Sequence, residues 1–120
     1  MDAIVYTSNS GFTKEYAEMM SQKTSLPAFS LTEAKSALKS GAEILYFGWL
    51  MAGSVKGYSE ARQKYKIRAV CAVGMGKSGS QMDDVKKHNR LPQALPLFTL
   101  QGGFDLNRLH GIYKFMMNAM

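Results

Sequence analysis

Residues 3–20 read AIVYTSNSGFTKEYAEMM, and this stretch decides the fold. Ala3–Thr7 is short and apolar, which is typical of a strand. Thr13–Lys23 carries Tyr16, Ala17 and Met20 at helical spacing, which predicts a helix with one inward face. A polar turn that contains Gly11 joins the two. A strand that passes through such a turn into a helix is how a parallel α/β sheet begins.

The alternation of strand and helix continues along the rest of the chain. Further strands are predicted at Ala28–Leu31, Glu43–Trp49, Ile67–Gly74 and Leu95–Gln101, and further helices at Thr32–Lys39, Gly57–Lys66, Ser80–His88 and Asp105–Met120. The third and fourth strands contain continuous apolar runs, which are expected of strands buried on both faces. Because parallel crossovers are right-handed, the helices divide between the two faces of the sheet. The pattern predicts a doubly wound, five-stranded parallel sheet in three α/β/α layers.

Length and composition favour one domain over residues 1–120. The last helix ends without a polar close, so both a natural end and a shortened chain remain open. The sequence has no apolar run of about 18 residues, so no transmembrane segment is predicted. It begins without a basic, apolar leader, and Cys71 is its lone cysteine. We therefore expect a cytoplasmic protein.

The net charge of +6 is unevenly distributed. Residues 54–90 contain nine Lys and Arg but three Asp and Glu, so this stretch carries the whole excess. It is either an ordinary solvated surface or a docking face for an anionic partner. No nucleic-acid-binding motif accompanies the charge, so a nucleic-acid partner is not expected.

The loop Ser8–Thr13 has the properties of a phosphate-binding loop. Gly11 allows close approach of the backbone, and Ser8, Ser10 and Thr13 supply hydroxyl donors. The helix that follows points its first amides and its dipole at the loop, which favours an anion. The alternative is an ordinary helix N-cap made by Ser10 or Thr13.

The motif Ile4-Val5-Tyr6-x-Ser8-x-x-Gly11-x-Thr13-x-x-x-Ala17-x-x-Met20 resembles the flavodoxin signature. It departs from that signature at Met20, where a branched aliphatic residue is preferred. The resemblance implies a flavodoxin-like fold and FMN as cofactor. It assigns the FMN phosphate to Ser8, Asn9, Ser10, Gly11, Phe12 and Thr13.

The same resemblance places the flavin ring between the loops after the third and fourth strands, with the loop after the fifth closing the pocket. Trp49 offers a flat surface for stacking on the ring, although it could equally fill the core. The glycines suit close approach to a flat ligand and would equally suit a loop without one. The ring contacts implied are Gly48, Trp49, Leu50, Met51, Ala52 and Gly53, then Gly74, Met75, Gly76 and Gly79, then Gly103 and Phe104.

Two loop motifs narrow the resemblance. Phe47-Gly48-Trp49-Leu50-x-Ala52-Gly53 and Gly102-Gly103-Phe104-Asp105-x-x-x-Leu109 resemble the flavodoxin branch that contains menaquinone-dependent protoporphyrinogen oxidase. The resemblance implies an FMN-binding electron-transfer protein with a redox partner protein. The alternative is an FMN-dependent oxidoreductase that acts on a quinone or an anionic substrate, and a third reading is a fold relative that has lost its cofactor. No catalytic or metal-binding residue is predicted, because His88 and His110 have no ligand cluster around them.

Overall fold

A parallel sheet forms the centre of the molecule. The computed structural model describes residues 1–8, 11–51, 53–74, 82–101 and 106–119. Its strands in these ranges are β1 (Ala3–Tyr6), β2 (Ala28–Ser30), β3 (Glu43–Met51), β4 (Ser54–Val55), β5 (Lys66–Gly74) and β6 (Leu97–Gln101). Five of them pair in parallel in the order β2-β1-β3-β5-β6. The predicted doubly wound, five-stranded parallel sheet is confirmed.

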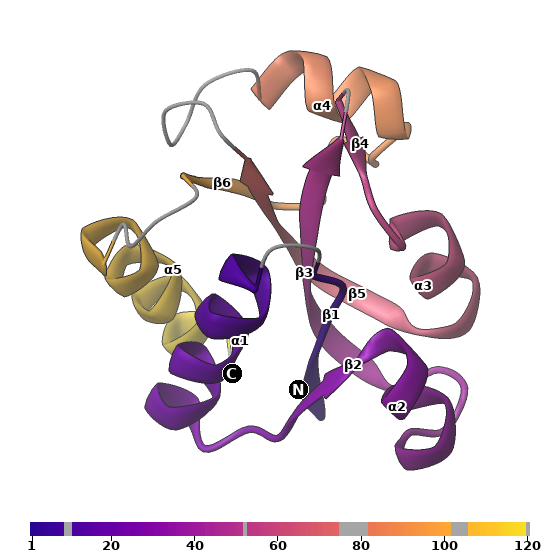
Figure 1. The fold of residues 1–120 in the computed structure, drawn as a ribbon, viewed down its shortest axis with the longest axis vertical. Coiled ribbons are helices and arrows are strands. Elements are labelled where there is room, and N and C mark those ends of the chain that lie inside the picture. Colours follow the sequence, from indigo (N-terminus) through magenta and orange to yellow (C-terminus); the bar gives the residue numbers. More distant parts are fainter. Residues whose placement is uncertain (9–10, 52, 75–81, 102–105, 120) are drawn as a thin grey trace.

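Helices cover both faces of this sheet (Figure 1). They are α1 (Phe12–Thr24), α2 (Leu31–Ala37), α3 (Tyr58–Lys64), α4 (Met82–Asn89) and α5 (Leu106–Ala119). The α1 and α5 helices lie on one face, and α2 and α3 lie on the other, with α4 beside the hairpin of β3 and β4. The predicted three layers are therefore present.

Strand alternation divides the core in two. On β3, Leu45 and Phe47 join the cluster under α1 and α5, whereas Ile44 and Tyr46 join the cluster under α2, α3 and α4. Successive side chains of a strand point to opposite faces, so one apolar run serves both clusters. This explains why the third and fourth predicted strands are continuously apolar.

The sequence did not predict β4. The β3 strand runs two residues beyond the predicted end at Trp49, to Met51. The chain then reverses with Gly53 at φ 82°, and β4 pairs antiparallel with the end of β3. The prediction that the segment 50–53 is wholly a loop is therefore wrong for its first two residues. A two-residue strand is too short to show the alternation of side chains that identifies strands. Gly53 directly before it and Gly57 two residues after it are also residues typical of turns.

Gly57 allows the hairpin to approach the sheet closely. It has φ 78°, and a Cβ there would overlap the hydroxyl oxygen of Tyr46 and lie 2.7 Å from Cγ2 of Thr7. Both the backbone conformation and the space thus require glycine. Gly41 has a similar φ of 87°, but a Cβ there would meet nothing within 4 Å.

We expect Gly57→Ala to destabilise the protein more than Gly41→Ala does. Gly41→Ala introduces left-handed strain alone, about 1–2 kcal/mol. Gly57→Ala adds overpacking against Tyr46 and Thr7, about 1–3 kcal/mol more. Urea unfolding of the two variants measures the difference, and equal losses would contradict the close approach at Gly57.

Candidate functional site

The carboxyl ends of the parallel strands form the edge where ligands bind in open α/β sheets. The Ser8–Thr13 loop leaves β1 at this edge and enters α1 (Figure 1). The hairpin of β3 and β4 extends past the end of β1 at the same edge, because β3 pairs with β1 only as far as Phe47. The end of β1, where this loop begins, and the hairpin are therefore neighbours.

The first turn of α1 is open toward the loop. Its N-cap is Gly11, with φ 95°, and no side chain among the described residues caps it. The N–H of Gly11 donates to Oγ of Ser8 at 3.1 Å, which closes the turn on itself. The alternative that Thr13 is the N-cap is wrong, because Thr13 is the second residue of the helix. Amide groups and the positive end of the α1 dipole thus face the loop.

Thr13 is buried beneath this loop. Its side chain is 2% exposed, and its hydroxyl forms no hydrogen bond with a described residue. The hydroxyl is thus available to donate to an acceptor oxygen. Phe12 is half-buried and packs against the α1/α5 cluster, which anchors the start of the helix.

A cavity of about 540 Å³ opens on the other side of the loop, between the end of β1 and the start of α2. Glu33 is the acidic residue of its lining and is engaged in the capping box with Ser30, whose hydrogen bonds lower the pKa of Glu33. Lys14 is the basic residue of the cavity lining. The cavity is lined by Tyr6, Thr7, Ser8, Lys14, Ser30, Leu31, Thr32 and Glu33.

Two hydroxyl groups fix the hairpin beside the loop. Tyr46 donates from Oη to the carbonyl oxygen of Lys56 at 2.6 Å, and Thr7 donates from Oγ1 to the same oxygen at 2.7 Å. The two hydroxyl oxygens are 3.0 Å apart. Burial raises the pKa of Tyr46 well above its ordinary value. Sequence reasoning missed these three residues, because they come from separate segments and match no motif.

The hairpin presents Trp49 and Leu50 to opposite faces of the sheet. Trp49 is half-buried and lies, by alternation, on the face of Phe47 and α1. Nζ of Lys56 lies 5.9 Å from the centroid of the Trp49 ring. Leu50 packs into the other cluster and lies over Gly74, where a Cβ would be 3.0 Å from Leu50 Cδ1. The two predicted ring contacts are therefore not brought together on one face.

The other predicted site residues divide into three groups. Gly48 is buried, and a Cβ there would lie 2.5 Å from Val55 Cγ1, so packing of the hairpin alone requires glycine. Gly53 makes the turn, and Met51 is 53% exposed at the end of β3. The residues that lie outside the described part of the chain are Asn9, Ser10, Ala52, Met75, Gly76, Gly79, Gly103 and Phe104.

Comparison with solved structures finds a likeness to a flavodoxin. A structure described as a flavodoxin from the domain Archaea aligns with a TM-score of 0.56 and 14% identity, over 98% of this chain and 95% of that chain. The chain has a flavodoxin-like fold. At this identity the likeness concerns the fold. No protein-family model and no curated protein matches the sequence.

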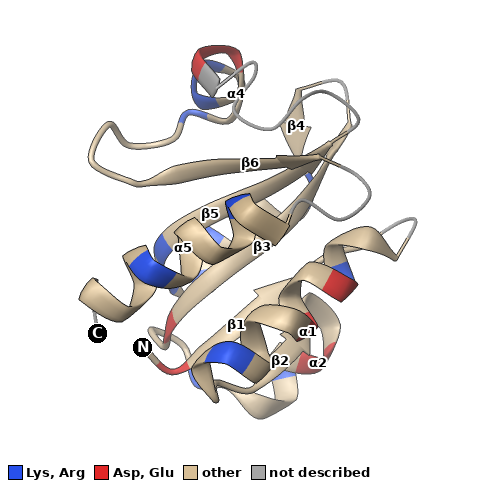
Figure 2. Ribbon diagram, turned by 90° about the vertical axis from the view of Figure 1, so that its left-hand side faces the viewer, with Lys and Arg blue, Asp and Glu red and all other residues tan. Residues whose placement is uncertain are grey.

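The basic stretch is dispersed over this flavodoxin-like fold. Lys66 begins β5 at the amino edge of the sheet, whereas Lys56 follows β4 at the carboxyl edge. Figure 2 shows both signs of charge on α4, at the end of this stretch. Within the described residues, no cluster of three His, Cys, Asp or Glu could hold a metal ion. None of the described helices is long and apolar enough to cross a membrane.

We expect the stability of the protein to fall above pH 10, and Tyr46→Phe to remove part of that fall. The raised pKa of Tyr46 means that its contribution is complete below pH 10, the ordinary value, and is lost as the pH rises toward the folded pKa. One such group contributes a slope of about 1.4 kcal/mol per pH unit. Chemical unfolding at several pH values above 10 measures it. Parallel curves for the variant and the unaltered protein would contradict the prediction.

Proposed function

We propose that this protein binds FMN non-covalently at the carboxyl edge of its sheet and transfers electrons. The start of α1 carries the proposal: Gly11 is left-handed, no described side chain caps the helix, and Thr13 supplies a hydroxyl in the first turn that forms no hydrogen bond with a described residue. Amides, a helix dipole and a hydroxyl together suit one terminal phosphate. When bound, the flavin supplies the redox chemistry.

Ser8, Gly11, Phe12 and Thr13 are the described members of the proposed phosphate site, and Asn9 and Ser10 complete it. On the hairpin, Trp49 is favoured as the ring contact over Leu50. The reason is that Trp49 and α1 lie on the same face of the sheet, so a ligand anchored at α1 extends toward Trp49. The further ring contacts proposed are Met51, Ala52, Gly53, Gly74, Met75, Gly76, Gly79, Gly103 and Phe104.

We expect FMN to quench the fluorescence of the apoprotein, because Trp49 is its only tryptophan. Thr13→Val keeps the side-chain volume but removes the hydroxyl. A hydrogen bond to a charged acceptor contributes about 1.5–3 kcal/mol, so the FMN dissociation constant should rise about 10- to 100-fold. Riboflavin, which lacks the phosphate, should bind more weakly than FMN and be unaffected by Thr13→Val. Fluorescence titration, supported by calorimetry, measures all four affinities.

Ser36→Ala serves as the matched control, since Ser36 is exposed on α2 away from the phosphate loop. Riboflavin binding as tightly as FMN would contradict the phosphate site. Full tryptophan emission in protein saturated with FMN would place Trp49 away from the ring. The visible spectrum of the purified protein gives an independent first check on flavin binding.

A second candidate function is an FMN-dependent oxidoreductase that acts on a quinone or an anionic substrate. Lys56 favours it, because this exposed lysine stands over the Trp49 ring and has no ion pair with a described carboxylate. A cation beside the proposed ring site attracts an anionic reactant and stabilises negative charge there. A carrier of electrons between proteins has no such need for a lone cation at the ring.

We expect Lys56→Gln to slow electron transfer from the reduced, FMN-loaded protein to a naphthoquinone sulfonate. Loss of one close charge in water changes the interaction by about 1 kcal/mol, so the rate should fall about fivefold at low salt. Added salt should remove the difference. Stopped-flow spectroscopy follows the reaction, with Lys39→Gln, an exposed lysine beyond α2, as the charge-matched control. No reaction with quinones would favour the electron carrier.

A further inference from the structure

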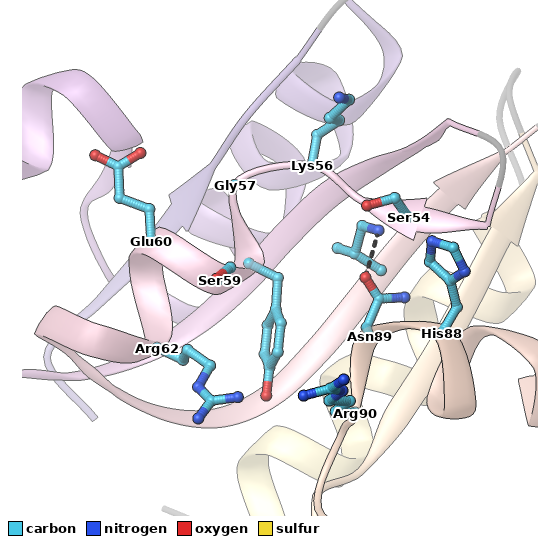
Figure 3. A pocket seen from close by; sticks show the side chains of 11 residues that line it. Ser54, Lys56, Gly57, Ser59, Glu60, Arg62, His88, Asn89 and Arg90 are labelled. Carbon is cyan, nitrogen blue, oxygen red and sulfur yellow. Dashed lines mark hydrogen bonds between the residues drawn. The ribbon is translucent and has the colours of Figure 1, made fainter.

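A second cavity, of about 560 Å³, lies between α3, the end of α4 and the hairpin (Figure 3). It opens on the face of the sheet opposite Trp49, and Lys56, whose Nζ lies over the Trp49 ring, is a residue that it shares with the proposed FMN site. Arg62 and Arg90 line it together with Tyr58. Its other polar lining residues are Ser54, Lys56, Ser59, Glu60, His88 and Asn89.

Two of these groups come from one turn of α3. Tyr58 and Arg62 are four residues apart, so they share a face of the helix. The body of Tyr58 is buried, and the Arg62 charge lowers the pKa of its hydroxyl against the larger effect of burial, which raises it. The Arg62 guanidinium and the Tyr58 hydroxyl therefore lie close together at the cavity. Figure 3 shows the Arg62 and Arg90 side chains reaching the same end of the cavity.

Arg90 occupies a position that usually belongs to glycine. Its φ is 54°, and its N–H donates to the carbonyl oxygen of Lys87 at 3.2 Å while that of Leu91 donates to Lys86 at 3.0 Å. This is the left-handed ending of α4 in which a Cβ is disfavoured. Glycine can therefore replace Arg90 without disturbing this backbone conformation.

Asn89 holds this end of α4 against the hairpin. Its Oδ1 accepts from the N–H of Val55 at 2.9 Å, and its Nδ2 donates to the carbonyl oxygens of Gly53 at 2.9 Å and Val85 at 2.8 Å. Every polar atom of the amide is thus engaged between two elements. The end of α4 that carries Arg90 is fixed relative to the hairpin as a result.

The charges in the cavity are unbalanced. Glu60 is the single carboxylate of the lining, and it pairs with Lys35 at 2.9 Å. In Figure 3 its side chain, like that of Lys56, is directed away from the arginines. Arg62 and Arg90 form no ion pair with a described carboxylate. Two guanidinium groups and a hydroxyl face one space without an acidic partner.

We propose that the cavity formed by Tyr58, Arg62 and Arg90 binds the phosphate or carboxylate group of a small anionic ligand. Guanidinium groups recognise such oxyanions through paired hydrogen bonds, and a tyrosine hydroxyl adds a further donor. The volume is that of a small-molecule site. A protein partner is disfavoured, because the large apolar side chains exposed in the described part of the chain, Met51, Leu106, Phe115 and Met117, do not line the cavity.

Calorimetry of the full chain with glycerol 3-phosphate and with citrate tests the proposal. At least one probe should bind with a dissociation constant below about 1 mM. Arg62→Gln and Arg90→Gly should each weaken that binding by about tenfold or more. Arg90→Gly is the decisive variant, because glycine suits the left-handed backbone at this position. The variant should unfold at the same or a higher urea concentration than the unaltered protein, and it should bind the anionic probe more weakly.

Two control variants distinguish binding in this cavity from binding elsewhere on the protein. Arg68→Gln removes a guanidinium that pairs with Glu43 at the amino edge of the sheet, and it should leave the affinity unchanged. Thr13→Val alters the proposed FMN phosphate loop, and it should also have no effect. The proposal is overturned if Arg90→Gly binds the probe with unchanged affinity. It is also overturned if Thr13→Val is the one variant that loses affinity, because the anion would then bind at the loop before α1. Binding of an acidic peptide, with no binding of either small probe, also overturns it.

Discussion

The carbonyl oxygen of Lys56 accepts hydrogen bonds from the hydroxyl groups of Thr7 and Tyr46, and the carboxyl edge of the sheet is organised around it. Thr7 follows β1 and Tyr46 lies within β3, so the carbonyl joins the start of the proposed phosphate loop to the hairpin. The contact is possible only because Gly57 has no side chain. Each such hydrogen bond contributes about 1 kcal/mol, but their greater effect is to fix where the hairpin lies.

Fixing the hairpin also separates two sites. Neighbouring residues of a strand point to opposite faces, so Trp49 joins the α1 face and Leu50 the face of α3 and α4. The hairpin can therefore border the proposed FMN site on one side and the arginine-lined cavity on the other. Asn89 secures the second side through Gly53 and Val55, as Thr7 and Tyr46 secure the first.

The sequence predicted the sheet correctly, and it suggested the proposed phosphate loop, because both depend on local patterns. Apolar runs such as Ile44–Phe47 identify buried strands wherever they occur, and the loop before α1 is read from adjacent residues. The β4 strand has two residues, which is too short for a recognisable alternation of apolar and polar side chains. The contact between Thr7, Tyr46 and Lys56, and the meeting of Arg62 with Arg90, depend on how distant segments pack. The sequence shows a glycine at position 57. It does not show that the Tyr46 hydroxyl leaves no room for a side chain there, because Tyr46 comes from a distant segment.

The two proposed anion sites use different physics on one small scaffold. At α1, the described groups that face the ligand are backbone amides, a helix dipole and the Thr13 hydroxyl, which are oriented by the fold and carry no formal charge. At the cavity, Arg62 and Arg90 bring full charges from two elements that must be held against each other. Oriented dipoles can be built into one strand, turn and helix, which is why the first site is visible in a short motif. Paired guanidinium groups repel each other, so the second site needs the Asn89 clamp and the left-handed Arg90 to hold them near one ligand.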